Sequence, residues 1–213
     1  MDPNLLIVTV GLAYLVIFGG MSVLRREGVS TQLIVEVLTL TVLIAGGGML
    51  TASAAHPILF LVCLYLVTTR SRLLVDLANL LSARGRQRDA ITVLQVALRL
   101  LPDRAARLII LVTMGIVQLR RQNPLSAQAL LESALAQGED GGLGLQQRAA
   151  CHYNLGLALQ RQGKEAQAVR HFSAAVETFP GSVYSKAAEE ALEQRRHRHN
   201  KMDEPPPPDK SPE

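Results

Sequence analysis

The stretch from Ala149 to Ser182 restricts the fold of this chain more strongly than any other part of the sequence. Apolar residues recur in it at the three- and four-residue intervals of amphipathic helices, and Gly163 divides it into two such helices. Small residues stand where the two helices must touch, and large apolar residues stand where they must be buried. The stretch therefore predicts a helical hairpin.

The small and large residues of this hairpin follow a regular spacing within a unit of about 34 residues. They are Leu155, Gly156, Ala158, Leu159, Gly163, Ala168, Phe172, Ala175 and Pro180. In these residues the hairpin resembles a tetratricopeptide repeat (TPR). His152 departs from the family pattern, because that position usually holds Trp or another large apolar residue.

A single hairpin of this kind cannot bury its apolar face alone, so further copies are expected to stack on it. Residues 71–104 repeat the pattern of residues 149–182. The turn glycine, the alanine five residues after it and the closing proline recur there as Gly85, Ala90 and Pro102.

Residues 108–141 form a degenerate third copy, which lacks the turn glycine and the closing proline. Asn123 and Pro124 are expected to make its turn instead. Residues 184–195 predict one more helix, which would cap the apolar end of the array. The sequence therefore predicts an α-solenoid of about three hairpins plus a capping helix over residues 71–196.

Charge divides the chain sharply, although the mean hydropathy of +0.20 hides the division. Every Lys, Arg, Asp and Glu lies from Arg70 onward except five. These five are Asp2, Arg25, Arg26, Glu27 and Glu36. Residues 1–70 are therefore predicted to be a membrane domain, so that the expected fold is all-α with transmembrane helices before the solenoid.

Residues 5–24 are an uncharged run long enough to cross a hydrocarbon core of about 30 Å as a helix. They are not typical of a cleavable signal peptide, because Arg25 and Arg26 follow the apolar run and no basic residue precedes it. We expect this helix to remain as an anchor.

Residues 33–69 are too long for one untilted span, so the small residues and proline between Gly46 and Pro57 predict a break. The two resulting spans are residues 33–50 and 55–69. No helix breaker occurs from Pro57 to Arg84, so the last span and the first repeat helix are expected to form one continuous rod.

Three spans place all the arginines that flank the membrane domain on one side. They are Arg25, Arg26, Arg70 and Arg72. The positive-inside rule then predicts a cytoplasmic repeat domain, whereas two spans would violate the rule at one loop.

Glu36 is the one ionisable residue within a predicted span. It could serve ion or proton passage or pair with a partner subunit. It also lies about one turn from the cytoplasmic face, where it could reach lipid headgroups or Arg25 and Arg26. We favour this second interpretation, because a lone acid makes a poor conduction path.

The resemblance implies that the first helices of the hairpins line a groove for a peptide or a partner helix. The corresponding residues here are Arg72, Val75, Asn79, Val112, Ile116, Arg120, Tyr153, Leu157 and Arg161. Such a surface favours an amphipathic segment with some anionic character. The apolar run around Val112 and Ile116 could equally be a buried central helix.

The sequence contains no recognisable catalytic, cofactor-binding, metal-binding or nucleic-acid-binding motif. His171, His197 and His199 do not predict a metal site, because His197 and His199 alternate with arginine, whose fixed charge would repel a cation. Residues 197–213 predict a disordered, basic and proline-rich tail.

We therefore expect a non-enzymatic scaffold that binds another protein and contacts membrane lipid. Similar membrane-anchored TPR proteins of bacterial cytoplasmic membranes and thylakoids include assembly factors, so the architecture suggests assembly or stabilisation of a membrane complex. The alternative is a small transport or signalling subunit in which Glu36 carries the activity and the repeats regulate it.

Overall fold

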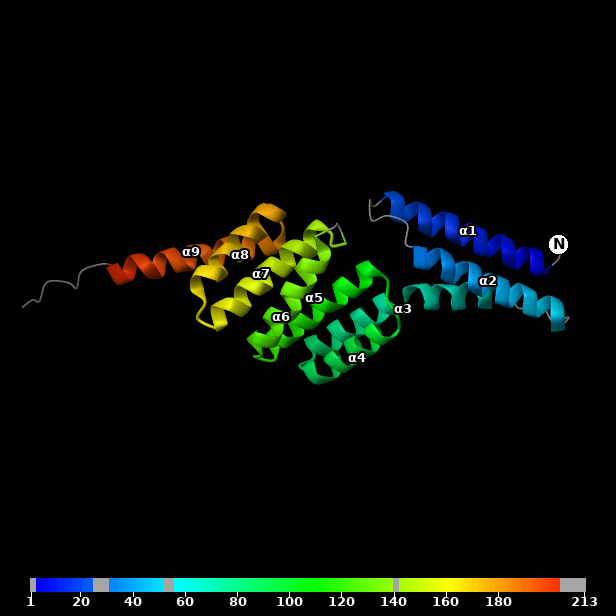
Figure 1. The fold of residues 1–213 in the computed structure, drawn as a ribbon, viewed down its shortest axis with the longest axis horizontal. Coiled ribbons are helices and arrows are strands. Elements are labelled where there is room, and N and C mark those ends of the chain that lie inside the picture. The colour runs from blue at the N-terminus through cyan, green and yellow to red at the C-terminus, as the bar shows by residue number, and fades with distance from the viewer. Residues whose placement is uncertain (1–2, 25–30, 52–55, 140–141, 204–213) are drawn as a thin grey trace, which may run out of the picture. The chain divides into compact units, whose positions relative to one another are not determined.

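A computed structural model describes residues 3–24, 31–51, 56–139 and 142–203. Over these residues the chain forms nine helices and no strand (Figure 1). The helices belong to two compact units, residues 1–113 and 114–213, and helix α5 (Arg104–Arg120) begins in the first unit and ends in the second. The all-α prediction is confirmed for the described part of the chain.

The first unit starts with three apolar helices that contact one another. They are α1 (Pro3–Leu24), α2 (Thr31–Thr51) and α3 (Pro57–Ala83). Ile7, Val37 and Leu64, one from each helix, are fully buried in their shared core. Gly11 lets α1 approach α2 closely, because a Cβ atom at this position would lie 2.5 Å from the hydroxyl oxygen of Thr41.

Helix α3 is continuous for 27 residues, as the absence of breakers predicted. Pro57 stands at its first turn, where a missing N–H costs nothing. Its amino-terminal half packs with α1 and α2, and its carboxy-terminal half forms a hairpin with α4 (Gln87–Arg99). One helix therefore belongs to both the apolar bundle and the first predicted repeat.

The second unit contains the carboxy-terminal end of α5 and four further helices. They are α6 (Pro124–Gly138), α7 (Leu145–Arg161), α8 (Glu165–Thr178) and α9 (Val183–Asp203). Helices α7 and α8 lie side by side as a hairpin, and α9 packs against both of them (Figure 1). The helix crossings depend on small residues, because a Cβ atom at Gly156 would lie 2.6 Å from the ring of Phe172.

The three hairpin turns share one geometry. In each, a backbone N–H bonds to the carbonyl oxygen five residues earlier, from Arg86 to Leu81, from Asn123 to Gln118 and from Lys164 to Leu159. This bond caps the end of a helix and requires a left-handed residue before the donor. Gly85, Gln122 and Gly163 supply that residue with positive φ angles of 79°, 61° and 76°.

The turn predicted at Asn123 and Pro124 is therefore present. The Asn123 side chain accepts a hydrogen bond from the Ser126 backbone N–H at 3.4 Å, and Pro124 occupies the first turn of α6. Gln122 takes the place of the glycine that the other two turns use.

Helix α9 is longer than the predicted capping helix. It continues past Arg195 to Asp203, so residues 197–203 are helical rather than part of an irregular tail. Arg198, Lys201 and Met202 in this segment are good helix formers, so its charge does not prevent a helix. Residues 204–213, with the four consecutive prolines, lie outside the described residues.

One helix in the described part of the chain, α3, is long and apolar enough by composition to cross a membrane. The apolar segments Leu5–Gly20 and Leu33–Gly48 are shorter than the length that this criterion requires. Residues 52–55, which belong to the third predicted span, lie outside the described residues.

Candidate functional site

The first three predicted groove residues lie on the carboxy-terminal half of α3. Arg72 and Asn79 are exposed, and Val75 is half-buried. Their spacing places them on one side of the helix, since three to four residues separate one from the next. This side of α3 offers polar groups with one partly accessible aliphatic side chain between them.

The predicted groove residues on α5 differ strongly in accessibility. Val112 is only 5% exposed and belongs to the protein core. Ile116 is partly exposed, and Arg120 is exposed in the last turn of the helix. Within the apolar run of α5, Val112 is therefore a core residue, whereas the Ile116 side chain remains partly accessible to a partner.

The groove residues on α7 mostly make internal contacts. The ring of Tyr153 lies 5.9 Å from that of Phe172 on α8 and 6.2 Å from that of Tyr184 on α9. Burial raises the pKa of the Tyr153 hydroxyl above its ordinary value, so this group stays neutral. Tyr153 therefore joins three helices, whereas Leu157, one turn later, is half-buried on α7.

Arg161 connects α7 to the end of α5. Its guanidinium donates to the carbonyl oxygen of Leu119 at 2.5 Å and, more weakly, to the side-chain oxygen of Gln122 at 3.4 Å. Carbonyls in the last turn of a helix lack helical partners, so a cation there is favourable. Sequence reasoning assigned Arg161 to the groove but missed this bond, because a contact over 42 residues leaves no local pattern.

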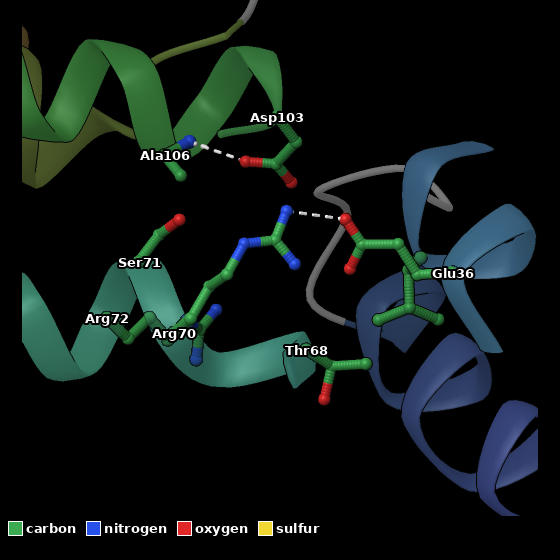
Figure 2. Close-up of a pocket in the computed structure, with 8 residues that line it drawn as sticks. Glu36, Thr68, Arg70, Ser71, Arg72, Asp103 and Ala106 are labelled. Atoms are coloured by element: carbon green, nitrogen blue, oxygen red, sulfur yellow. Dashed lines mark hydrogen bonds and ion pairs between the residues drawn. The ribbon is translucent and has the colours of Figure 1, made fainter. Parts of the chain in front are cut away.

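A second cluster of polar groups lies within the first unit, where α2 and α3 meet the connection between α4 and α5. Figure 2 shows the Arg70 guanidinium directed toward the Glu36 carboxylate, and the two groups form an ion pair at 2.6 Å. Arg70 also donates to the carbonyl oxygens of Val67 at 2.8 Å and Leu100 at 3.1 Å. One side chain thus binds α2, its own helix and the end of α4.

A small pocket of about 80 Å³ adjoins this ion pair. Asp103 lies at its edge and accepts a hydrogen bond from the Ala106 backbone N–H at 2.8 Å, which caps the start of α5 (Figure 2). The pocket is lined by Leu33, Glu36, Thr68, Arg70, Ser71, Arg72, Asp103 and Ala106. Its mixture of acidic and basic groups is nearly neutral overall and has the size for water rather than for a substrate.

The sequence interpretation expected lipid headgroups or Arg25 and Arg26 as partners of Glu36. Those two arginines lie outside the described residues. The structure pairs Glu36 with Arg70, which is 34 positions away. The sequence features that could have predicted this pair are the single acidic residue in the apolar segment of α2 and the basic residue at the end of the apolar segment of α3.

Hydroxyl groups occupy the inside of the apolar bundle. The Tyr14 hydroxyl lies 2.6 Å from that of Thr68, and the Thr68 hydroxyl donates to the carbonyl oxygen of Leu64 at 2.9 Å. Thr41 is buried and donates to the carbonyl oxygen of Val37 at 2.7 Å. Three hydroxyl groups of α1–α3 thus make contacts inside the bundle, although Thr9, Thr39 and Tyr65 are exposed. Many large apolar side chains of the bundle also face outward.

No group of three or more potential metal ligands comes together in the part of the chain that the structure describes. The arrangement there includes close polar contacts but no recognisable nucleophile with a base beside it. The accessible surfaces of these residues could bind another molecule, and the described residues there form no recognisable catalytic arrangement.

Hairpins that cross at small residues and turn through left-handed caps define the class of helical-repeat proteins. Within this class, residues 106–180 match the family model described as tetratricopeptide repeat, and that segment is TPR sequence. The match includes the whole degenerate copy at residues 108–141 and nearly all of the copy at residues 149–182. Repeats of this family generally act as non-catalytic scaffolds for protein interaction.

No curated protein sequence matches the chain significantly. Among solved structures, the N-terminal domain of stress-induced protein-1 (STI-1) from C. elegans matches with 18% sequence identity and a TM-score of 0.48. The match covers 58% of this chain and 95% of that domain.

Proposed function

We propose that this chain is a membrane-anchored TPR scaffold that binds a protein partner and serves the assembly or stabilisation of a membrane protein complex. The observation that carries the proposal is the large number of exposed apolar side chains on α1–α3, together with the continuity of α3 into the first hairpin. Exposed apolar side chains are favourable in contact with lipid. The continuous α3 connects the first hairpin rigidly to the apolar bundle.

The outward-facing side chains of the bundle are large and apolar. Val16 and Leu59 are examples on α1 and α3. In water, each such side chain would forgo about 1.5–3 kcal/mol of burial free energy, and many of them would do so together. In lipid the same surface costs nothing, while inward hydroxyls and a neutralised ion pair are the arrangement that a hydrocarbon environment favours.

Three spans remain our proposal for the bundle. At about 1.5 Å per residue, α1 with 22 residues and α2 with 21 residues would each extend slightly more than 30 Å, about the thickness of a hydrocarbon core. Arg70 and Arg72 would then lie at the cytoplasmic boundary with the repeats beyond it. We propose the bacterial cytoplasmic membrane or the thylakoid as the location.

The partner would bind the accessible residues of the proposed groove. In the second unit these are Ile116 and Leu157, with Arg120 exposed near one end. Aliphatic side chains beside a cation fit an amphipathic helix or extended segment that carries some negative charge. Tyr153 and Arg161 would support this surface from within, because their side chains hold neighbouring helices.

A transport or signalling role centred on Glu36 receives less support. Its ion pair with Arg70 and the bonds of Arg70 to helix carbonyls suit a structural element better than a proton relay. A conducting acid would be expected to line a continuous polar path, and most of the neighbouring bundle is apolar.

Site-specific photo-cross-linking in native membranes tests the proposal. A photoreactive residue at Leu157 should capture a distinct membrane protein, and the same residue at the exposed Glu177 of α8 serves as the control. Replacing Ile116 with Asp should reduce the capture from Leu157, because a buried charge would weaken an apolar contact. Equal capture from both positions, or capture from neither, would contradict a specific groove.

A further inference from the structure

The hairpin of α7 and α8 contains a histidine pair that the proposed scaffold function does not use. The Nδ1 atoms of His152 and His171 lie 3.2 Å apart, and the two rings are nearly parallel with centroids 5.5 Å apart. Both side chains are partly accessible. Without a further ligand, one Nδ1–H donates to the other ring nitrogen.

The separation of the two nitrogens fits the bite of a transition-metal ion. Zinc binds imidazole nitrogen at about 2.0–2.1 Å, and two ligands at a tetrahedral angle of about 109° are then about 3.3–3.4 Å apart. The observed distance of 3.2 Å is close to this value. Small rotations of the rings would turn both lone pairs from each other toward a shared ion.

We infer that His152 and His171 form a two-nitrogen site for a divalent transition-metal ion of the zinc, nickel or copper type, which clips α7 to α8. Both nitrogens would bind as neutral imidazoles that keep their proton on Nε2. The one proton now shared between the Nδ1 atoms would therefore move to Nε2 of the same ring, without net release.

The surroundings keep both rings ready to bind. Burial, followed by the charges of His171 and Arg148, lowers the pKa of His152 to about 4. Burial also lowers the pKa of His171, although the nearby Glu132 carboxylate acts in the opposite direction. Both rings are thus mainly neutral at pH 7, and a metal ion does not have to displace a proton from an imidazolium.

Two neighbouring groups adjust the affinity in opposite senses. Arg148 repels a cation, but its guanidinium donates to the carbonyl oxygen of Gly138 at 3.1 Å and is held there. Glu132 on α6 attracts one. Cys151 contributes nothing, because its thiol bonds to the carbonyl oxygen of Leu131 and burial raises its pKa to about 12. Water must complete the coordination, so the site is open and exchangeable.

Titration of the full-length protein with Zn²⁺ by calorimetry tests the inference, in detergent micelles at pH 7.5. The starting variant carries H197N and H199N, which remove the other carboxy-terminal histidines as competing ligands. It should bind one Zn²⁺ and unfold at a higher temperature with Zn²⁺ than with a chelator. Adding H152N or H171N should weaken binding by about tenfold or more, since each removes one of two protein ligands.

The matched control is H56N, which should leave the affinity unchanged. Retained Zn²⁺ affinity in both the H152N and H171N variants, or no binding by the starting variant, would overturn the inference. Copper-catalysed oxidation of the unaltered protein, read by mass spectrometry, needs no folded variant. It should modify His152 and His171 ahead of His56, and the opposite order would contradict the site.

Discussion

At the scale of single residues, the glycines of the repeat pattern stand at positions where a side chain would be unfavourable. Gly156 has no room for a Cβ atom because the ring of Phe172 lies in its place. Gly163 has open space around it but a φ angle that side chains disfavour. Two glycines of one motif therefore have different physical causes.

Gly156→Ala should destabilise the second unit by roughly 1–3 kcal/mol, the usual cost of overpacking a filled core. The added methyl group must push the Phe172 ring out of its position. Chemical denaturation measures the loss. Phe172→Leu should offset part of it in the double variant, and strictly additive effects of the two changes would contradict a direct clash.

Gln122→Gly should stabilise the protein slightly, by roughly 0.5 kcal/mol. The left-handed conformation at Gln122 costs about 1–2 kcal/mol, which glycine would relieve. Glycine also makes the unfolded chain more flexible, which offsets about 0.4–1 kcal/mol of this stabilisation. The weak bond from Arg161 to Gln122 is also lost. Thermal unfolding measures the change, and the neighbouring Arg121→Gly is the control, for which only a loss is expected.

At the scale of helices, the sequence was sufficient for most elements and insufficient for their polar connections. The continuous α3 and the turn at Asn123 followed from breakers and caps, which act locally. The distant partners of Arg70 and Arg161 did not, because the bonds to Glu36, Leu100 and Leu119 span at least 30 residues. Likewise, helical spacing placed Tyr153 on the predicted groove face without revealing that Tyr184 of α9 lies beside its ring.

Glu36→Gln should loosen the connection between α4 and α5. Arg70 would remain charged beside apolar helices, and turning toward water would release the carbonyl oxygen of Leu100. We expect a loss of roughly 1–3 kcal/mol, the cost of removing a charged hydrogen-bond partner. Hydrogen exchange should increase at residues 100–103.

The exposed ion pair of Arg86 and Asp89 provides the control for this change. Its side chains are 65% and 47% exposed, against 25% and 21% for Arg70 and Glu36. Water screens exposed pairs, so Asp89→Asn should cost at most about 1 kcal/mol and leave exchange at residues 100–103 unaltered. Equal effects of the two variants would contradict a special role for Arg70.

At the scale of the whole chain, the central question is which solvent surrounds α1–α3. Length and composition alone single out α3, and a buried core helix could pass the same test. The outward direction of the apolar side chains is the more specific observation, since a water-soluble bundle would turn them inward. A substitution that distinguishes lipid from water must therefore be placed on an already exposed position.

Val42→Arg and Leu125→Arg form such a matched pair, because their side chains are 68% and 67% exposed. If α2 crosses a membrane, arginine near its centre costs about 2.5–3.5 kcal/mol of insertion free energy, whereas Leu125 on α6 faces water in either case. The Val42→Arg protein should therefore be depleted from alkaline-washed membranes, and the Leu125→Arg protein should be retained. Equal retention of both would place α2 in water and remove the basis for a membrane-anchored scaffold, while leaving the repeats as a protein-binding module.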